Sequence, residues 1–252
     1  MPHTNNAAEH EDAQAMGETV DLMTEGPAVI SASPLATAPV AQSSDVFAQA
    51  VDLGLRTRQG CPYAGMTFAV RKGELTALRG RGGSGKTALL LTLAARMTHN
   101  QGELAILGEP MPKRARKVQR RIGLGLVKGV NDLRPNLTVE STVAAELSLF
   151  GKPAKRENVE GYLRSWQLEG AARMNVGDLP AEKLQQLGIA LGMAGDPEAL
   201  AVDDVETSLT LRQSTRLMEL LARTARERGV AVMVACASRD LAQMADCVIE
   251  LS

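Results

Sequence analysis

A glycine-rich stretch between residues 80 and 87 constrains this chain more than any other feature. Its residues, in order, are Gly80, Arg81, Gly82, Gly83, Ser84, Gly85, Lys86 and Thr87. Two glycines with four residues between them, followed by Lys and Thr, form the pattern of a phosphate-binding loop, called here the phosphate loop. Backbone N–H groups can wrap a polyphosphate only where no side chain blocks the approach, and the four glycines leave that approach open. Lys86 can then reach the outer phosphates, and the Thr87 hydroxyl can complete the coordination shell of a magnesium ion.

The residues on either side place the phosphate loop between a strand and a helix. Residues 74–78 form a short, largely apolar run typical of a strand, and an apolar helix is predicted over residues 88–97. The positive end of the helix dipole then points at the same anion. A glycine-rich surface turn is the alternative interpretation, but the strand–loop–helix setting favours binding of a nucleotide phosphate tail.

Composition indicates a globular chain and argues against several classes of partner. The 252 residues can bury a full core, and with only 2% aromatic residues that core must consist mostly of Leu, Val, Ala and Met. A net charge of −1 argues against a nucleic-acid partner. The acidic N-terminus has neither the positive start nor the apolar core of a secretory signal, and the three cysteines share no metal-like spacing. We therefore expect a cytoplasmic protein that reaches a membrane only through a partner.

The hydrophobic pattern divides the chain at about residue 48. Residues 1–48 are rich in Ala, Ser, Thr, Pro and acids, which predicts a disordered extension, either regulatory or an inert tail. Residues 49–252 alternate short apolar runs with longer helical ones, which predicts one α/β domain with a largely parallel sheet. Residues 138–196 carry almost no strand signal, so we expect a helical subdomain inserted there.

A basic segment at residues 113–121 carries six Lys or Arg in nine positions. We interpret it as the solvated face of a helix, with a phosphate or lipid contact as the alternative. Neither interpretation changes the assignment of the phosphate loop.

A second anchor for magnesium is predicted where the apolar run 199–202 ends in Asp203. Ligands of α/β folds bind at the carboxyl ends of parallel strands, and an acid at such an end commonly completes the magnesium shell of phosphate-loop proteins. Asp204 follows directly. The alternative is a loop acid that caps a helix.

Taken together, the layout from about residue 51 to residue 252 resembles the nucleotide-binding subunit of an ATP-binding cassette (ABC) transporter. The resemblance is carried by the phosphate loop, by Pro-Asn-Leu-Thr-Val-Glu at residues 135–140, by the Asp203–Asp204 pair and by Asp-Cys-Val at residues 246–248. It implies a P-loop NTPase fold, ATP and magnesium as cofactors, and two partners. These are an integral-membrane permease and a second ATP-binding subunit, in a homodimer or a heterodimer at the cytoplasmic membrane.

The chain departs from the family pattern in the segments that sense and clasp the nucleotide. The family's magnesium-sensing Gln is replaced by Val127 or Gly129, depending on the direction of counting. The signature Leu-Ser-Gly-Gly-Gln aligns with Leu-Pro-Ala-Glu-Lys at residues 179–183. In a head-to-tail dimer that signature clasps the γ-phosphate held by the opposite subunit. Pro180 supplies neither hydroxyl nor N–H and Glu182 brings negative charge, so the resemblance implies a poor clasp.

The hydrolytic positions are also altered. The general base, normally Glu, aligns with Asp204, whose carboxylate is one methylene shorter. The attacking water would then sit about 1 Å too far away, and misplacement on that scale can cost about a hundredfold in rate. Thr210 stands where a dimer-contact Asp is usual. The switch His should lie near Ser238 or Arg239, and Arg239 can supply positive charge there with a different geometry.

The aromatic residue that stacks on adenine in the family should fall near Thr57 and is missing. Arg56 or Arg58 can stack on the base instead, whereas Tyr63 is expected in the core. The phosphate and magnesium half of the site is thus intact and the hydrolytic half is depleted. Two hypotheses follow: an ATP-binding transporter subunit with slow or partner-dependent hydrolysis, or a non-hydrolysing module in which the nucleotide only sets a conformation.

Overall fold

The computed structural model describes residues 28–30 and 45–252. Its centre is a six-stranded sheet in which every neighbouring pair of strands is parallel. The order across the sheet is β1 (Ala28–Ile30), β10 (Cys247–Glu250), β4 (Leu75–Arg79), β9 (Ala231–Cys236), β8 (Ala199–Val202) and β7 (Ile122–Leu124). The largely parallel sheet is therefore confirmed.

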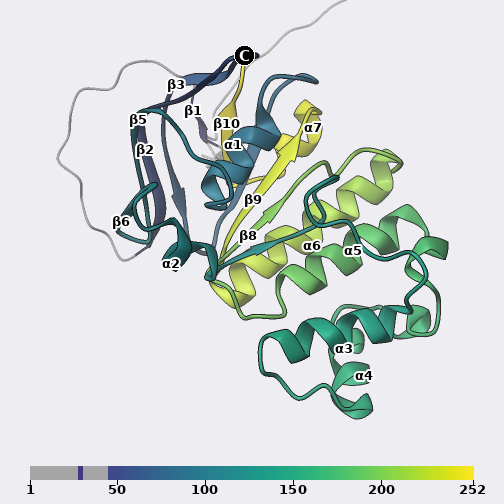
Figure 1. Ribbon diagram of the computed structural model, residues 1–252. Coiled ribbons are helices and arrows are strands. Elements are labelled where there is room, and N and C mark those ends of the chain that lie inside the picture. Colours follow the sequence, from purple (N-terminus) through teal and green to yellow (C-terminus); the bar gives the residue numbers. More distant parts are fainter. Residues whose placement is uncertain (1–27, 31–44) are drawn as a thin grey trace, which may run out of the picture.

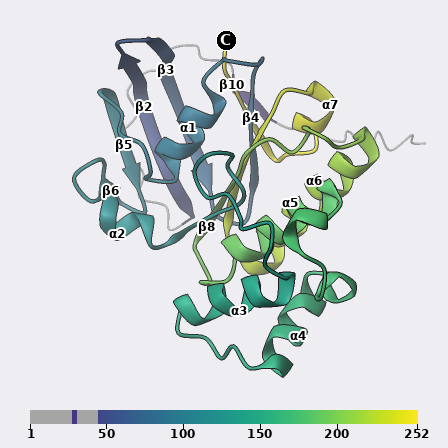
Figure 2. The same cartoon turned by 45° about the vertical axis from the view of Figure 1, so that its right-hand side comes forward.

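A second sheet of four antiparallel strands lies against the first, on the side of α1 (Figures 1 and 2). Its order is β3 (Gly60–Arg71), β2 (Val46–Thr57), β5 (Gln101–Ile106) and β6 (Glu109–Pro110). The alternating apolar runs predicted strands in this part of the chain but not that four of them form a separate sheet. Pairing partners of antiparallel strands are set by tertiary contacts, which the pattern of one strand does not contain.

Two hydrophobic cores lie on opposite faces of the parallel sheet. Helix α1 (Lys86–Leu93) is buried between the two sheets, where Leu89, Leu90 and Leu93 pack with residues of β2, β3 and β9. On the other face, α5 (Ala181–Gly192) and α6 (Leu211–Arg228) form the larger core. Side chains of a strand alternate between faces, so Val232 and Val234 of β9 enter the α6 core and Met233 enters the α1 core.

The helices between β7 and β8 lie within residues 138–196, where the sequence pattern predicted a helical segment. Between β7 and β8 the chain forms α3 (Val139–Leu149), α4 (Arg156–Ser165), the short turns η1 (Glu169–Ala171) and η2 (Val176–Asp178), and then α5. In both views α3 and α4 lie at the end of the molecule away from the antiparallel sheet (Figures 1 and 2). The basic segment forms a shorter helix than expected, α2 (Ala115–Gln119), and α7 (Arg239–Ala242) precedes the last strand.

Two differences from the expected boundaries concern the N-terminal extension. Strand β2 begins at Val46, three residues before the predicted domain start, and Phe47 and Ala48 are fully buried. Residues 28–30 form β1, which pairs with β10. The start of β2 lies between β3 and β5, and burial of Phe47 and Ala48 there removes their apolar surface from water. The rest of the predicted extension lies outside the described residues.

Within the described ranges, no helix is long and apolar enough to cross a lipid bilayer.

Candidate nucleotide-binding site

The phosphate loop joins the end of β4 to the start of α1, and its glycines are needed for different reasons. Gly85 has φ 88°, and a Cβ atom there would lie 2.1 Å from the carbonyl oxygen of Pro62. A Cβ atom on Gly80 would lie 2.3 Å from Ser84 Oγ. Gly82, by contrast, has open space around it. Gly80 and Gly85 are therefore required because the loop packs tightly against its own chain, and Gly85 also because of its left-handed φ.

Lys86 lies over the loop that precedes it. Its Nζ atom donates hydrogen bonds to the carbonyl oxygens of Gly80 at 2.7 Å and Arg81 at 2.8 Å. An ammonium group has three donors, so one is left beyond these two contacts. The two carbonyls hold the charge at the mouth of the loop, where the prediction from sequence puts the outer phosphates.

Thr87 and Asp203 meet although 116 positions separate them in the chain. Thr87 Oγ1 donates a hydrogen bond of 2.8 Å to Asp203 Oδ2. Burial raises the pKa of Asp203, while the hydrogen bond from Thr87 works in the opposite direction. A hydroxyl and a carboxylate oxygen at this position are the hard ligands that magnesium prefers, so the donor set fits the predicted cation.

Asp204, the predicted general base, sits in a tight turn. Its φ is 49°, a left-handed conformation, and its Oδ1 accepts the backbone N–H of Glu206 at 3.3 Å and of Thr207 at 2.9 Å. Burial by itself would raise the pKa of Asp204, but the hydrogen bonds from Thr207 and the backbone outweigh it and lower that pKa. The carboxylate is thus held to its own loop and made a weaker base.

A pocket of about 450 Å³ opens beside the two acids. Besides Asp203 and Asp204, it is lined mainly by apolar residues of the β7–α3 loop, of η2 and of α5, among them Leu126, Leu133 and Leu184. The loop after β7 is the place of the missing glutamine. There Asn131 holds the backbone, because its Oδ1 accepts the N–H of Val127 and its Nδ2 donates to the carbonyl oxygen of Gly125. Neither Val127 nor Gly129 has a side-chain amide that could contact a cation.

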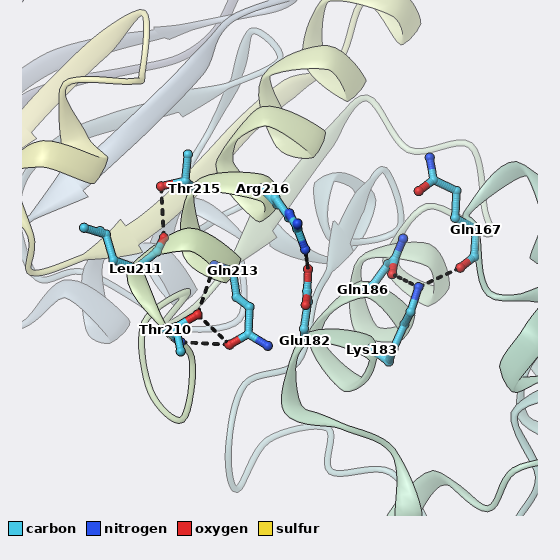
Figure 3. A network of polar contacts seen from close by, with 9 residues as sticks. All are labelled: Gln167, Glu182, Lys183, Gln186, Thr210, Leu211, Gln213, Thr215 and Arg216. Atoms are coloured by element: carbon cyan, nitrogen blue, oxygen red, sulfur yellow. Dashed lines mark hydrogen bonds and ion pairs between the residues drawn. The ribbon is translucent and has the colours of Figure 1, made fainter.

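In the segment aligned with the family signature, residues 179–183, the charged side chains contact other residues of the same chain (Figure 3). Pro180 is the N-cap residue of α5 and provides no side-chain cap. Glu182 forms an ion pair of 3.8 Å with Arg216 of α6. Lys183 donates to the carbonyl oxygen of Gln167 at 2.8 Å and to Gln186 Oε1 at 3.0 Å. Both charged side chains of the segment are therefore engaged within the chain.

Thr210, at the position of the dimer-contact Asp, is the N-cap residue of α6 (Figure 3). Its side chain accepts the N–H of Gln213, and the Gln213 side chain accepts the N–H of Thr210 at 2.9 Å. This reciprocal pair is a capping box, which satisfies donors that a helix start leaves without partners. The structure thus gives Thr210 a local role within the chain.

The expected position of the base-stacking residue lies at the β2–β3 turn. Arg56, Thr57 and Arg58 are all exposed there. Tyr63 is buried, and its hydroxyl lies 2.7 Å from Thr92 Oγ1 of α1, as expected for a core residue. Burial raises the pKa of Tyr63, with the Thr92 hydrogen bond acting against it. Arg56 and Arg58 therefore remain the candidates for stacking on a base.

Glu206 is a site residue that sequence reasoning missed. Its carboxylate accepts the backbone N–H of Ser238 at 2.9 Å and that of Ala237 in a shorter contact. The signal available in the sequence was its place two positions after Asp204, in the turn that follows a strand-ending acid. Nothing in the sequence indicated that it would meet a loop 31 positions away.

This fold and this arrangement of loop, lysine and acids match a known family. Residues 63–207 match the family described as ABC transporter. The chain belongs to that family.

Two relatives are similar to this chain over about two thirds of its length. The chain is 31% identical over 172 residues to the Nod factor export ATP-binding protein I of Burkholderia orbicola, covering 68% of this chain and 56% of that protein. The protein of the same name from Rhizobium meliloti is 32% identical over 169 residues, covering 63% of this chain and 49% of the relative. The matched region thus spans about half the length of these relatives.

Solved structures share the fold. CbiO1 from Clostridium perfringens, part of the ABC transporter complex CbiONQ, superposes with a TM-score of 0.73 at 20% identity over 82% of this chain and 85% of that one. The dimeric bacterial ABC transporter cassette MJ0796 superposes with a TM-score of 0.69 at 20% identity, covering 81% of this chain and 94% of that cassette. The ABC ATPase type of fold is therefore confirmed.

Proposed function

We propose that the phosphate loop and Asp203 together bind Mg-ATP. The observation that carries this is the 2.8 Å contact between Thr87 and Asp203 at the mouth of a loop that admits only backbone at Gly80 and Gly85. Magnesium, when bound, would neutralise the phosphate oxygens. Thr87 and Asp203 would hold the cation, the loop N–H groups and Lys86 would hold the phosphates, and the start of α1 would face them with its positive end.

The wider function we propose is that of an ATP-binding subunit of a membrane transporter. Its partners are then an integral-membrane permease and a second ATP-binding subunit, which place it at the cytoplasmic face of a membrane. Family membership supports this, and MJ0796 forms a dimer. The names of the relatives refer to export, so we propose export as the direction of transport.

Hydrolysis by this subunit is proposed to be slow or dependent on a partner. Asp204 occupies the position expected for the base, and its carboxylate is held to its own turn by the backbone N–H groups of Glu206 and Thr207. A second subunit with an intact signature would have to supply the clasp over the Lys86 site. The nucleotide site of that second subunit would in turn face residues 179–183 of this chain, where Pro180 supplies no hydroxyl.

A second candidate is a non-hydrolysing binding module in which ATP only sets a conformation. The observation that favours it is that Glu182 and Lys183 are engaged by Arg216, Gln167 and Gln186 (Figure 3). These contacts would have to break before the two side chains could turn toward a nucleotide on an opposite subunit.

The binding proposal is tested by titrating the purified chain with ATP with and without magnesium. Asp203→Asn should remove the magnesium dependence while the fold survives, because Asn keeps the shape and loses the charge. Asp52→Asn is the control, since Asp52 is an exposed aspartate of β2 in the antiparallel sheet. An Asp203→Asn variant with the full magnesium response would contradict the assignment of Asp203.

The two candidates are separated by phosphate release, measured on the chain alone and with co-purified membrane partners. The transporter subunit should release phosphate above the Lys86→Ala baseline only when partners are present. The non-hydrolysing module should stay at that baseline in every preparation. A pull-down that recovers neither a permease nor a second ATPase would contradict the transporter proposal.

A further inference from the structure

The carboxylate of Glu206 joins two loops at the nucleotide end of the sheet. It leaves the turn after β8 and accepts two successive backbone N–H groups, those of Ala237 and Ser238, directly after β9. Strands β8 and β9 are neighbours, so the contact bridges the carboxyl ends of adjacent parallel strands. Ligands of such sheets bind at this edge. We call residues 237–239 the switch segment.

This contact completes a ring of hydrogen bonds around the proposed phosphate site. The N–H of Gly80 donates to the carbonyl oxygen of Cys236, which directly precedes the switch segment, at 3.2 Å. Glu206 then joins that segment to the turn after β8, and its own N–H donates to the Asp204 carboxylate. Asp203 in turn accepts the Thr87 hydroxyl, which returns the ring to the phosphate loop. Movement of one segment is therefore resisted by the others.

The ring fixes the start of α7, where an arginine is found. Ser238 is the N-cap residue of α7, and its hydroxyl accepts the N–H of Leu241 at 3.4 Å. Arg239 is the first residue of that helix and is exposed. Among the ion pairs of the described residues, none involves Arg239. A cation at this edge of the sheet is thus available to an anionic ligand.

We propose that Glu206 is a positioning residue that holds the switch segment so that Arg239 meets the terminal phosphate of a bound nucleoside triphosphate. The proposal rests on Mg-ATP binding at the phosphate loop. Its consequence is selectivity: a diphosphate lacks the group that Arg239 would contact, so Glu206 should matter for ATP and not for ADP.

Two other roles for Glu206 are less consistent with its contacts. A general base must have a carboxylate oxygen free to contact the attacking water, whereas both carboxylate oxygens of Glu206 already accept backbone N–H groups. A purely structural brace would also use these bonds. It would, however, alter the affinity for ATP and for ADP alike, since the phosphate loop binds the phosphates that the two nucleotides share.

The test is a double-mutant cycle read as the ratio of ADP to ATP dissociation constants in the presence of magnesium. Glu206→Gln keeps the size of the side chain but turns an amide donor toward one backbone N–H. We expect it to lower the preference for ATP by about fivefold to tenfold, a usual coupling between groups that act together. Arg239→Gln should lower the preference at least as much. In the Arg239→Gln background, adding Glu206→Gln should change the ratio by less than about twofold.

Glu219→Gln is the matched control, because Glu219 is exposed on α6. It should leave the ratio unchanged. Glu206→Asp keeps the charge but is one methylene too short to reach both N–H groups, so it should also lower the preference. It provides a second variant if Glu206→Gln fails to fold, and circular dichroism verifies the fold of each.

Distinct results would overturn the inference. Equal loss of ATP and ADP affinity would make Glu206 a structural brace. If Glu206→Gln had the same effect in the Arg239→Gln background as in the unmodified chain, Glu206 would not act through Arg239. An unchanged ratio in a folded Glu206→Asp variant would also contradict it. If the unmodified chain bound neither nucleotide, the proposed function itself would fall, which is a different outcome from a chain that binds ATP and is indifferent to Glu206.

Discussion

Replacing Lys86 by alanine removes a positively charged side chain from the mouth of the phosphate loop. In the structure its ammonium donates to the carbonyl oxygens of Gly80 and Arg81 and keeps a third donor. If the loop binds ATP, that donor and the charge act on the phosphates. The variant should therefore lose nucleotide affinity with little change in the fold.

The expected magnitude follows from these contacts. A hydrogen bond to a charged group contributes about 1.5–3 kcal/mol. Converted at about 1.4 kcal/mol per factor of ten, its loss weakens binding by roughly tenfold to 150-fold. The bond to Arg81 is exposed, so water replaces it after truncation, and the bond to Gly80 is part-buried. Loss of that one bond should cost about 1 kcal/mol of unfolding free energy.

The assay is a calorimetric titration with Mg-ATP at fixed ionic strength, together with a thermal unfolding curve. Lys113→Ala is the control, because Lys113 is an exposed lysine beside the antiparallel sheet, at the start of the basic segment. It should bind ATP as the unmodified chain does. Unchanged affinity in Lys86→Ala would refute the assignment of the loop, and a melting temperature lowered by much more than about 4 °C would mean that the loop had collapsed instead.

Other predictions concern the base, a helix start and an ion-pair cluster. Asp204→Glu should raise phosphate release by the assembled complex, by up to about a hundredfold; no change there would place the block to hydrolysis elsewhere. Thr210→Ala should lower the unfolding free energy by about 1 kcal/mol through loss of the cap of α6, seen as a melting temperature lower by about 2–4 °C. An equal melting temperature would contradict the capping role. Burial alone would raise the pKa of Glu198, but its contacts with Lys72 and Arg121 outweigh this and hold the pKa below its ordinary 4.5. The stability that ionised Glu198 adds is therefore present above pH 4.5 and is lost as the pH falls below it through the lowered pKa. Glu198→Gln should accordingly destabilise the chain in denaturant titrations at pH 7, and the difference should shrink as the pH falls below 4.5. A pH-independent difference would be inconsistent with this.

The amino-acid sequence determined the local features of this protein. The spacing of Gly80, Gly85, Lys86 and Thr87 predicts the loop, because backbone access and charge placement depend on residues adjacent in the chain. The alternation of apolar runs predicts the strands of the parallel sheet and the helices inserted between β7 and β8. The unusual residues at the signature position could also be recognised, since a resemblance aligns them one by one.

The tertiary structure decided which distant groups meet. The contacts of Thr87 with Asp203 and of Glu206 with the switch segment join residues far apart in the chain. Whether Glu182 would face a partner or its own Arg216 also depended on how α5 packs on α6. The antiparallel sheet is a further case, because a strand pattern does not name its neighbour. Such contacts follow from the packing of whole elements, and no local pattern in the sequence encodes them.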